Sequence, residues 1–248
     1  MDYRERVYRQ DHRQEDLVHF QLAVKETDLD IGIRKERFSP ELVKWVEETM
    51  LACRRPLEEY ILRDPGFVKS LIPYEVLPNA PVIVQTMAEA GRLAGVGPMA
   101  AVAGAVSEWV GKEISKRSRD VIVENGGDIF IRTSRIRRVG IFAGNSPLSN
   151  RVALEIRPEQ TPLGICTSSG KVGHSLSFGQ ADAVVVLSPS VALADAVATA
   201  GGNMVKKVDD LEKTLEFAAG IEGVTGMVII KDDRLAAWGN VKLLPNQV

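Results

Sequence analysis

Asp195 and Thr199 are the side chains whose type and spacing point most directly to chemistry. They stand four residues apart in a segment rich in Ala and Val, so a helix there would place both on one face, one turn apart. A carboxylate and a hydroxyl are hard oxygen ligands of the kind that Mg²⁺ prefers. The pair therefore predicts a Mg²⁺ site, although Asp195 taken alone would also suit a helix cap or an ion pair with a lysine.

A loop of small polar residues precedes this helix and reaches one of the three histidines of the chain, His174. Its hydroxyl groups and glycine amides suit an anionic ligand such as a phosphate. His174 is a candidate acid–base group or ligand, with an ordinary structural histidine as the competing interpretation. The loop is not a Walker A motif, because five residues separate Gly164 from Gly170 and Val172 stands where that motif needs Ser or Thr. The candidate ligand-binding positions are Thr167, Ser168, Ser169 and Gly170.

A second candidate surface is the turn inside segment 120–131. Two β-rich runs flank Asn125-Gly126, a dipeptide that is the strongest short signal for a β-hairpin. A tight hairpin explains the sequence by itself. Gly126 and Gly127 also leave bare backbone beside Asp128, where a flat or charged ligand could come close.

The elements that must position these groups come in runs along the chain: strands, helices, strands, a helix and strands. We expect strands at 3–9, 18–27 and 31–33; a helix opened by Ser39-Pro40-Glu41 that Pro56 ends or restarts; helices at 81–93 and 99–118; strands at 139–143, 152–156 and 183–187; a helix opened by Ser188-Pro189; a helix at 209–219; a hairpin over 224–238; and a short strand at 241–244. This order indicates an α+β fold with largely antiparallel β-sheets and packed helices.

Three side-chain environments also follow from the pattern. His12 and His19 fall in a charged turn and on the polar face of a strand, so both are expected to be solvated. The basic run at Arg135, Arg137 and Arg138 is more typical of a solvated strand edge than of a phosphate clamp.

Composition narrows the class of protein. With 248 residues, 45% hydrophobic and 26% charged, we expect one domain over 1–248, with sub-halves at 1–80 and 81–248 as the alternative division. A net charge of −2 gives no reason to expect nucleic acid or an anionic membrane as partner. Two cysteines without metal-ligand spacing disfavour a disulfide framework or a zinc site. The charged start and the interrupted apolar run 94–110 favour a cytoplasmic protein without a membrane span.

Three segments, in the same order, resemble the ApbE-type FAD:protein FMN transferases over about residues 85–240. NGGDI at 125–129 resembles the family's N-x-GGD signature, and CTSSG at 166–170 followed by His174 is similar to its T-S-G loop and downstream histidine. LADAVATA at 193–200 resembles its A-D-A-x-A-T-A helix. Two departures stand out. The family's A-K-G-x-A-x-D corresponds here to 95–101 without the Lys or the Asp, and SLSFG follows the histidine in place of I-x-D-P-x-T-G.

The resemblance implies an ApbE-like α+β fold with a cleft for FAD or FMN and a divalent metal, usually Mg²⁺, near the pyrophosphate. It would assign metal binding to Asp195 and Thr199 and the family's histidine to His174. Contacts with the flavin nucleotide would fall to the hairpin and the loop, at Asn125, Gly126, Gly127, Asp128, Thr167, Ser169 and Gly170. In that family FMN is moved onto a Thr or Ser hydroxyl of a protein substrate.

Three hypotheses follow. The first is a divergent cytoplasmic branch of this superfamily that binds a flavin or related nucleotide with Mg²⁺ and acts as a flavin transferase. The second is a non-catalytic accessory or ligand-binding protein that retains the fold. The third is a different enzyme with His174 as acid–base and Ser168 or Ser169 as nucleophile, which no G-x-S-x-G elbow supports. Whether the chain acts on a protein substrate or forms a homo-oligomer stays open in all three.

Overall fold

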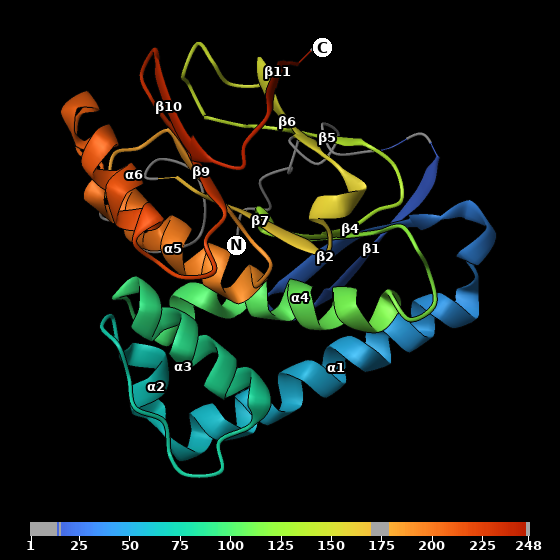
Figure 1. The fold of residues 1–248 in the computed structure, drawn as a ribbon. Helices are drawn as coiled ribbons and strands as arrows, with labels where there is room; N and C mark the ends of the chain where they lie inside the picture. Colours follow the sequence, from blue (N-terminus) through green and yellow to red (C-terminus); the bar gives the residue numbers. More distant parts are fainter. Residues whose placement is uncertain (1–13, 15, 170–178, 247–248) are drawn as a thin grey trace.

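An antiparallel β-sheet runs through the middle of the protein (Figure 1). The computed structural model describes residue 14 and residues 16–169 and 179–246. Within these residues the sheet has eight strands in the order β1-β2-β3-β4-β7-β8-β9-β10, and each neighbouring pair is antiparallel. The strands are β1 (Leu17–Val24), β2 (Thr27–Arg34), β3 (Val121–Asn125), β4 (Asp128–Arg132), β7 (Leu163–Ser168), β8 (Ala183–Ser188), β9 (Gly226–Lys231) and β10 (Arg234–Gly239). The predicted α+β class with antiparallel sheets is confirmed.

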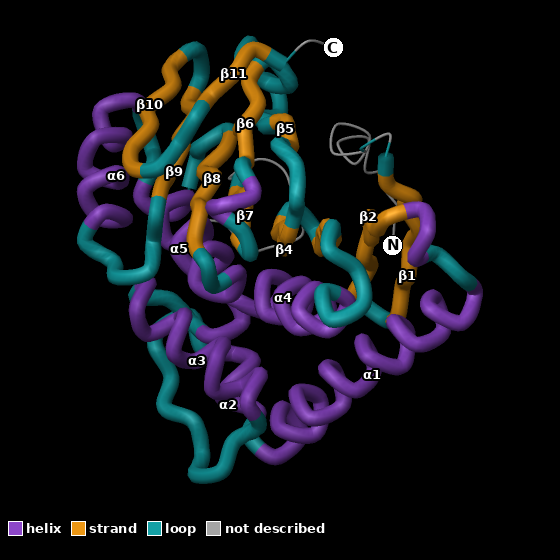
Figure 2. The backbone as a smooth tube through the Cα atoms, turned by 45° about the vertical axis from the view of Figure 1, so that its right-hand side comes forward, coloured by secondary structure: helices purple, strands orange, loops and turns teal. Residues whose placement is uncertain are grey.

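A second sheet covers one face of the first, and helices cover the other (Figure 2). The second sheet pairs β11 (Leu243–Pro245), β6 (Val152–Ile156) and β5 (Arg137–Gly140) in that order. Because side chains alternate along a strand, β3 serves two cores at once. Val121 and Val123 pack among the helices, whereas Ile122 packs against the small sheet.

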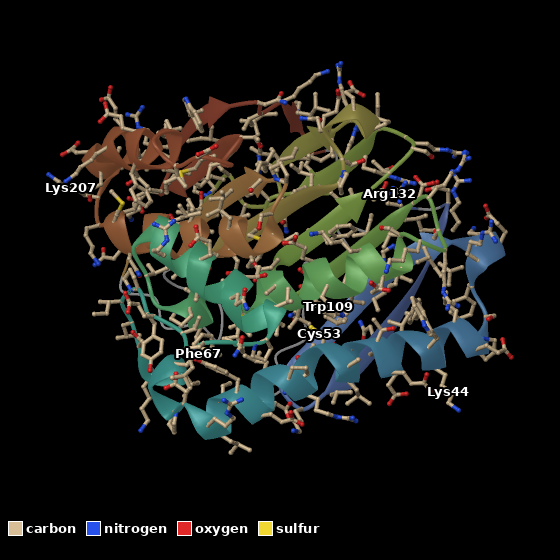
Figure 3. All side chains as sticks on the ribbon, turned by 60° about the horizontal axis from the view of Figure 1, so that its bottom comes forward. Lys44, Cys53, Phe67, Trp109, Arg132 and Lys207 are labelled. Carbon is tan, nitrogen blue, oxygen red and sulfur yellow. The ribbon has the colours of Figure 1, made fainter. Side chains whose placement is uncertain are left out.

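The helices lie on one face of the large sheet. They are α1 (Pro40–Arg63), α2 (Pro65–Lys69), α3 (Val82–Ala94), α4 (Val102–Ile114), α5 (Val191–Met204) and α6 (Leu211–Ala219), with 3₁₀ turns η2 (Lys35–Arg37), η3 (Pro98–Ala101), η4 (Pro158–Gln160) and η5 (Val208–Asp210). Helix α4 packs against β3 and β4, α5 against β7 and β8, and α6 against β9 and β10. Figure 1 shows α4 between the sheet and α1. Figure 3 places Cys53 of α1 and Trp109 of α4 near this helix–helix contact. The small residues of α4 and α5 let both helices lie close to the strands.

Two helix boundaries differ from the predicted ones. Ser39 caps α1 as expected, its Oγ accepting from Leu42 N at 3.2 Å, but the helix continues through Pro56. The buried residues Cys53 and Leu57 hold the helix to the core on both sides of that proline, and this packing outweighs the lost hydrogen bond. The cap of α5 is Ser190, whose Oγ accepts from Leu193 N, and not the predicted Ser188.

Other differences concern strands. β7 was not predicted, because its last residues read as part of the Thr/Ser/Gly loop. β5 begins at Arg137, and the run expected at 139–143 leaves the sheet after Gly140. The strand expected at 3–9 lies outside the described residues. Within the described part of the chain no single helix has the length and apolar character to cross a membrane; α3 with η3–α4 would meet that test only as a pair bent by 104°.

Two predicted solvent-exposed side chains are in fact buried. The His19 side chain is only 7% exposed, with Nδ1 3.3 Å from Asp30 Oδ1. Arg137 is 3% exposed and binds both carboxylate oxygens of Asp16, at 2.5 and 3.0 Å. The basic run is therefore divided, because its central member is a structural group of the interior. His12 lies outside the described residues.

Candidate functional site

The β3–β4 turn is formed by two glycines, in a backbone conformation that favours glycine. Gly126 and Gly127 have φ of +67° and +104°, a region that other residues adopt only with strain. The N–H of Gly127 donates to Glu124 Oε1 at 2.8 Å, which fixes the turn. A Cβ added to Gly126 would meet no atom within 4 Å, so the turn faces open space. The predicted hairpin is confirmed, and the bare backbone that it offers to a ligand is accessible.

Asp128 follows the turn and points to the helix side of the sheet. It is 6% exposed and pairs across the sheet with Cys166 of β7. Burial and the neighbouring charge of Asp195 hold the pKa of Asp128 well above its ordinary value, despite a hydrogen bond from the Cys166 thiol. Burial, followed by the charge of Asp128, likewise raises the pKa of Cys166, so the thiol stays neutral.

Asp195 and Thr199 are the partly exposed residues among positions 191–200 of α5, whose other members are buried. Asp195 Oδ2 accepts from the backbone N–H of Gly104 at 2.8 Å. Burial raises the pKa of Asp195 to about 7, against the opposing effect of hydrogen bonds from the N–H groups of Gly104 and Ala103. The carboxylate therefore lies at the start of α4, where backbone N–H groups have no partner within their own helix.

A close contact between α4 and α5 makes this arrangement possible. A Cβ on Gly104 would lie 2.5 Å from the carbonyl oxygen of Val191 and 2.8 Å from the Cβ of Asp195. Asn125 ties the hairpin to the same place, since its Nδ2 donates to the carbonyl of Ala103 at 3.1 Å. The start of α4 thus joins the hairpin to α5, and the amide nitrogen of Asn125 is used for that purpose.

The three hydroxyl residues at the end of β7 divide between the two faces of the sheet. Thr167 donates its backbone N–H to the carbonyl of Gly127 at 3.2 Å, and Thr167 and Ser169 line a cavity with the glycine turn. Ser168 lies on the helix side, where a Cβ on Gly202 of α5 would be 3.1 Å from its Oγ. The structure thus brings Thr167 and Ser169 to the turn and Ser168 to α5. Gly170 and His174 lie outside the described residues.

The cavity beside the turn lies between the two sheets and has a volume of about 70 Å³. Ile129, Ile165 and Val185 of the large sheet form one wall, and Val139, Ile141 and Leu154 form the other. Sites that enclose a cofactor have volumes of about 300–1,000 Å³. The cavity as it stands therefore has room only for part of a ligand that lies across its mouth.

The oxygen atoms of Asp128, Asp195 and Thr199 suit a divalent metal whose remaining ligands come from water or from a bound phosphate. Among the residues that the structure describes, no three His, Cys, Asp or Glu side chains form a group that could hold a metal ion. Mg²⁺ is commonly held by one or two carboxylates, with water and phosphate oxygens completing its shell. Asp128, Asp195 and the hydroxyl of Thr199 fit that pattern, and the electrostatic interaction between the two carboxylates is what a bound cation would relieve.

Sequence reasoning missed two residues that build the site. Gly104 gives α4 its close approach to Asp195, and Glu108 of α4 accepts from Val191 N and Ala192 N at 2.7 and 3.2 Å, capping α5. Both contacts join positions more than 80 residues apart. The small-residue composition of α4 indicated close packing, but nothing in the local pattern indicated the partner.

Comparison with known proteins places this geometry in a family. The family model described as AbpE bacteria matches residues 9–223. The UPF0280 protein of Methanococcus aeolicus is 38% identical over 230 residues, covering 91% of each chain. The UPF0280 protein of Methanocella arvoryzae is 44% identical over 195 residues, covering 78% of this chain and 79% of its own.

Solved structures agree at the level of the fold. Flavin Transferase ApbE from Vibrio cholerae superposes with a TM-score of 0.54 at 15% identity, covering 90% of this chain and 96% of its own. The apbe protein from Thermotoga maritima gives a TM-score of 0.56 at 12% identity, covering 89% and 96%. With the family match over most of the chain, these comparisons lead to one conclusion: the protein belongs to the AbpE bacteria family, a divergent branch of the ApbE-like superfamily.

Proposed function

We propose that the protein binds a flavin nucleotide, FAD or FMN, together with Mg²⁺ between the β3–β4 turn and α5. The observation that carries the proposal is the pair of neighbouring carboxylates, Asp128, which is buried, and Asp195, which is partly exposed. Burial and the charge of Asp195 raise the pKa of Asp128, and burial raises the pKa of Asp195 to about 7. Perturbed carboxylates of this kind concentrate at functional sites, because a fold gains no stability from them.

Each group has a role in this proposal. Asp195, Asp128 and Thr199 would hold Mg²⁺, which when bound would neutralise charge on the pyrophosphate of the ligand. The backbone of Gly126 and Gly127 would lie against the flavin ring. Thr167, Ser169 and Gly170 would donate to phosphate oxygens, and Asn125 would support the turn through its contact with Ala103.

A flavin transferase is the activity that we propose for this site, since a structural neighbour is titled Flavin Transferase ApbE. In such a transfer the bond between the FMN phosphate and AMP breaks, and a Ser or Thr oxygen of a protein substrate bonds to the phosphorus. The hydroxyl loses its proton and AMP leaves. His174 is the residue proposed to take that proton, in a cytoplasmic protein formed as one domain over 1–248.

One observation favours the alternative, a non-catalytic accessory or ligand-binding protein. Segment 95–101 lacks the Lys and Asp of the family motif that it resembles. A Cβ on Gly97 of this segment would lie 1.9 Å from the carbonyl oxygen of Ser70, so the segment is packed tightly against the chain that follows α2. Close packing therefore explains the sequence of segment 95–101 without a catalytic role.

The test is a titration of the purified protein with FAD and with FMN, each with and without Mg²⁺, followed by flavin fluorescence. The first hypothesis expects Mg²⁺ to tighten FAD binding at least tenfold in wild type. D195N should lose that dependence, and D233N, at a carboxylate that is 75% exposed, should keep it. Absence of flavin binding in all four titrations would refute the proposal.

Chromatography of the same mixtures separates the two candidates. AMP released from FAD in the presence of a Ser- or Thr-containing acceptor peptide supports the transferase, whereas binding without AMP supports the accessory protein. The third hypothesis, with His174 and Ser168 or Ser169 in a hydrolase, requires S169A or S168A to abolish the same hydrolysis as H174A.

A further inference from the structure

A second pocket lies at the opposite end of α4 from the carboxylate pair. α4 has 13 residues and is about 20 Å long. Its first turn meets Asp195, and the chain after its last turn, Ser115–Arg119, forms one wall of a pocket of about 400 Å³ whose other wall is Arg34 and η2. Figure 1 shows the end of α4 on the right of the view, beside the start of α1. The pocket is therefore separate from the candidate flavin site.

The pocket is strongly cationic although the chain has a net charge of −2. Five of its lining side chains are Arg or Lys, and Glu36 is its one acidic side chain among the described residues. Three of the five have partners outside the pocket: Lys116 pairs with Glu113 at 2.5 Å, Arg117 lies over the ring of Trp45 at 3.8 Å, and Arg34 binds Asp120. Arg132, labelled in Figure 3, donates to the carbonyl of Ser115 at 3.0 Å and adds another cation beside this wall.

Arg34 is fixed in the pocket wall by a buried carboxylate. Its Nε donates to Asp120 Oδ2 at 2.5 Å, and its Nη2 donates to Ser134 Oγ at 2.8 Å. Asp120 is 2% exposed. Burial alone would raise the pKa of Asp120, but hydrogen bonds from Ser134, Arg34 and Thr133 lower it well below its ordinary value. Asp120 is thus charged at neutral pH, and it holds one guanidinium in a set direction.

Arg37 and Arg119 differ from these three. Both are exposed pocket-lining residues, and neither makes an ion pair or hydrogen bond with a described residue. A helix C-terminus attracts positive charge, which accounts for Lys116 and Arg117 at the end of α4. It does not account for Arg37, which comes from η2 and approaches from the other wall. Two guanidinium groups without a partner among the described residues thus line the pocket on opposite walls, beside a third that is anchored.

We propose that this pocket binds a small molecule that carries at least two linked phosphate groups, through Arg37 and Arg119, with Arg34 as a fixed positive charge in the wall whose own nitrogens face Asp120, Ser134 and Glu36. Guanidinium groups bind phosphate oxygens in bidentate fashion, and several of them are needed to balance a diphosphate. The volume of about 400 Å³ falls within the range of small-molecule sites. It also leaves room for a group attached to the phosphates, such as a nucleoside.

Calorimetric titration with inorganic pyrophosphate tests the proposal, in buffer with EDTA so that no Mg²⁺ supports binding at the carboxylate pair. Wild type should bind, and R37A/R119A should raise the Kd at least tenfold. R151A/R234A removes the same charge from two exposed arginines elsewhere and should change the Kd less than twofold. D195N should bind as wild type does, which keeps this result independent of the proposed flavin site.

The outcomes are decisive in both directions. A tighter Kd for ADP than for pyrophosphate, or equal values for the two, supports a phosphate site and decides whether a nucleoside adds contacts. Absence of pyrophosphate binding refutes the proposal, as does equal weakening by the two double variants. Retention on heparin that is lost in R37A/R119A, without pyrophosphate binding, would also refute it, in favour of a macromolecular polyanion. Because Arg37 and Arg119 are exposed and unpaired, matching melting temperatures should confirm that the variants are folded.

Discussion

The two ends of the β3–β4 hairpin each hold a buried carboxylate, and the two environments are opposite. Asp120, immediately before β3, receives hydrogen bonds from Arg34, Thr133 and Ser134 and has a lowered pKa. Asp128, at the start of β4, faces Asp195 and has a raised one. The same hairpin thus has, at one end, a carboxylate whose hydrogen-bond partners balance its charge (the satisfied end). At the other end it has two neighbouring carboxylates without a compensating positive charge (the unsatisfied end).

The two kinds of carboxylate have opposite effects on the stability of the fold, and this distinguishes a structural role from a functional one. A buried carboxylate with a complete set of partners stabilises the fold, and its removal leaves those partners stranded. Two carboxylates placed together in the interior destabilise the fold unless something outside the chain binds them. We therefore expect removal of the carboxylate to lower the stability of the protein at one end of the hairpin and to raise it at the other.

The largest effect is expected at the satisfied end. Asp120→Ala leaves Arg34 and the 3%-exposed Arg137 without the carboxylate that both contact. Breaking a buried ion pair costs about 3–5 kcal/mol, so we expect a loss of about 3 kcal/mol or more in the free energy of unfolding. Urea denaturation at pH 7 measures it. A loss below about 1 kcal/mol would mean that Asp16 and Ser134 replace Asp120.

The pH dependence provides the control for this variant. The pKa of Asp120 is lower in the folded protein than in the unfolded chain, so its contribution is complete above the unfolded value of about 4 and is lost as the pH falls below it. The difference in stability between wild type and D120A should therefore narrow below pH 4. A constant difference would point to lost packing and not to charge.

A methyl group at Gly104 should produce the next largest effect. Its Cβ would lie 2.5 Å from the carbonyl oxygen of Val191, so Gly104→Ala must push α4 away from α5. Overpacking of this kind costs about 1–3 kcal/mol, and the N–H that Asp195 accepts from would move with it. The control is Gly220→Ala, where a Cβ would meet its first atom at 3.5 Å. Thermal unfolding compares the two, and equal shifts would contradict the close contact.

At the unsatisfied end, removal of the carboxylate should stabilise the protein, whereas removal of Asp120 destabilises it. Asp195 has a pKa of about 7 in the folded protein, above its unfolded value, so wild type loses stability as the pH rises from about 4 through 7. Asp195→Asn cannot ionise and can still accept from Gly104. We expect D195N to be more stable than wild type at pH 8 by about 1 kcal/mol, below the limit of roughly 4 kcal/mol that three pKa units represent.

Chemical denaturation at pH 5 and pH 8, in EDTA, checks this expectation. The gain of D195N should shrink at pH 5, where wild type is largely protonated at this position. Addition of Mg²⁺ with FAD should raise the stability of wild type and leave D195N unchanged. If D195N were less stable than wild type at pH 8, Asp195 would be a structural acid like Asp120.

The contrast between the two ends also marks what the sequence could predict. The fold class, the hairpin and the helical spacing of Asp195 and Thr199 rest on local periodicity and turn chemistry, and they were predicted for that reason. Pro56 and β7 were misjudged because packing overrode the local signals of a helix break and a polar loop. The error at Pro56 lies inside α1, whereas the error at β7 concerns the strand that carries the candidate residues Thr167 and Ser168.

The partners of the candidate residues could not be predicted from local patterns. Gly104 and Asp195 are 91 positions apart, and Arg137 reaches Asp16 across 121 positions. An arginine in a basic run gives no sign of whether it will be buried, since the carboxylate that decides this comes from another strand or terminus. Spacing along one helix singled out Asp195 and Thr199 as candidate ligands, whereas the charge compensation that distinguishes Asp120 from Asp128 depends on tertiary contacts.

The smallest effect on stability is expected at Thr199, and it sharpens the comparison most. Thr199 is partly exposed, so Thr199→Val should change the free energy of unfolding by no more than about 0.5 kcal/mol. If its hydroxyl binds Mg²⁺, the increase in melting temperature that Mg²⁺ and FAD cause should be about half as large in T199V as in wild type. This loss is smaller than the loss expected in D195N, because a hydroxyl is a weaker ligand than a carboxylate. Thr86→Val, at an exposed hydroxyl of α3, is the control. A wild-type response in T199V would leave the two carboxylates as the proposed protein ligands, and the site would then be defined by the approach of Asp128 of β4 to Asp195 of α5 and not by spacing along α5.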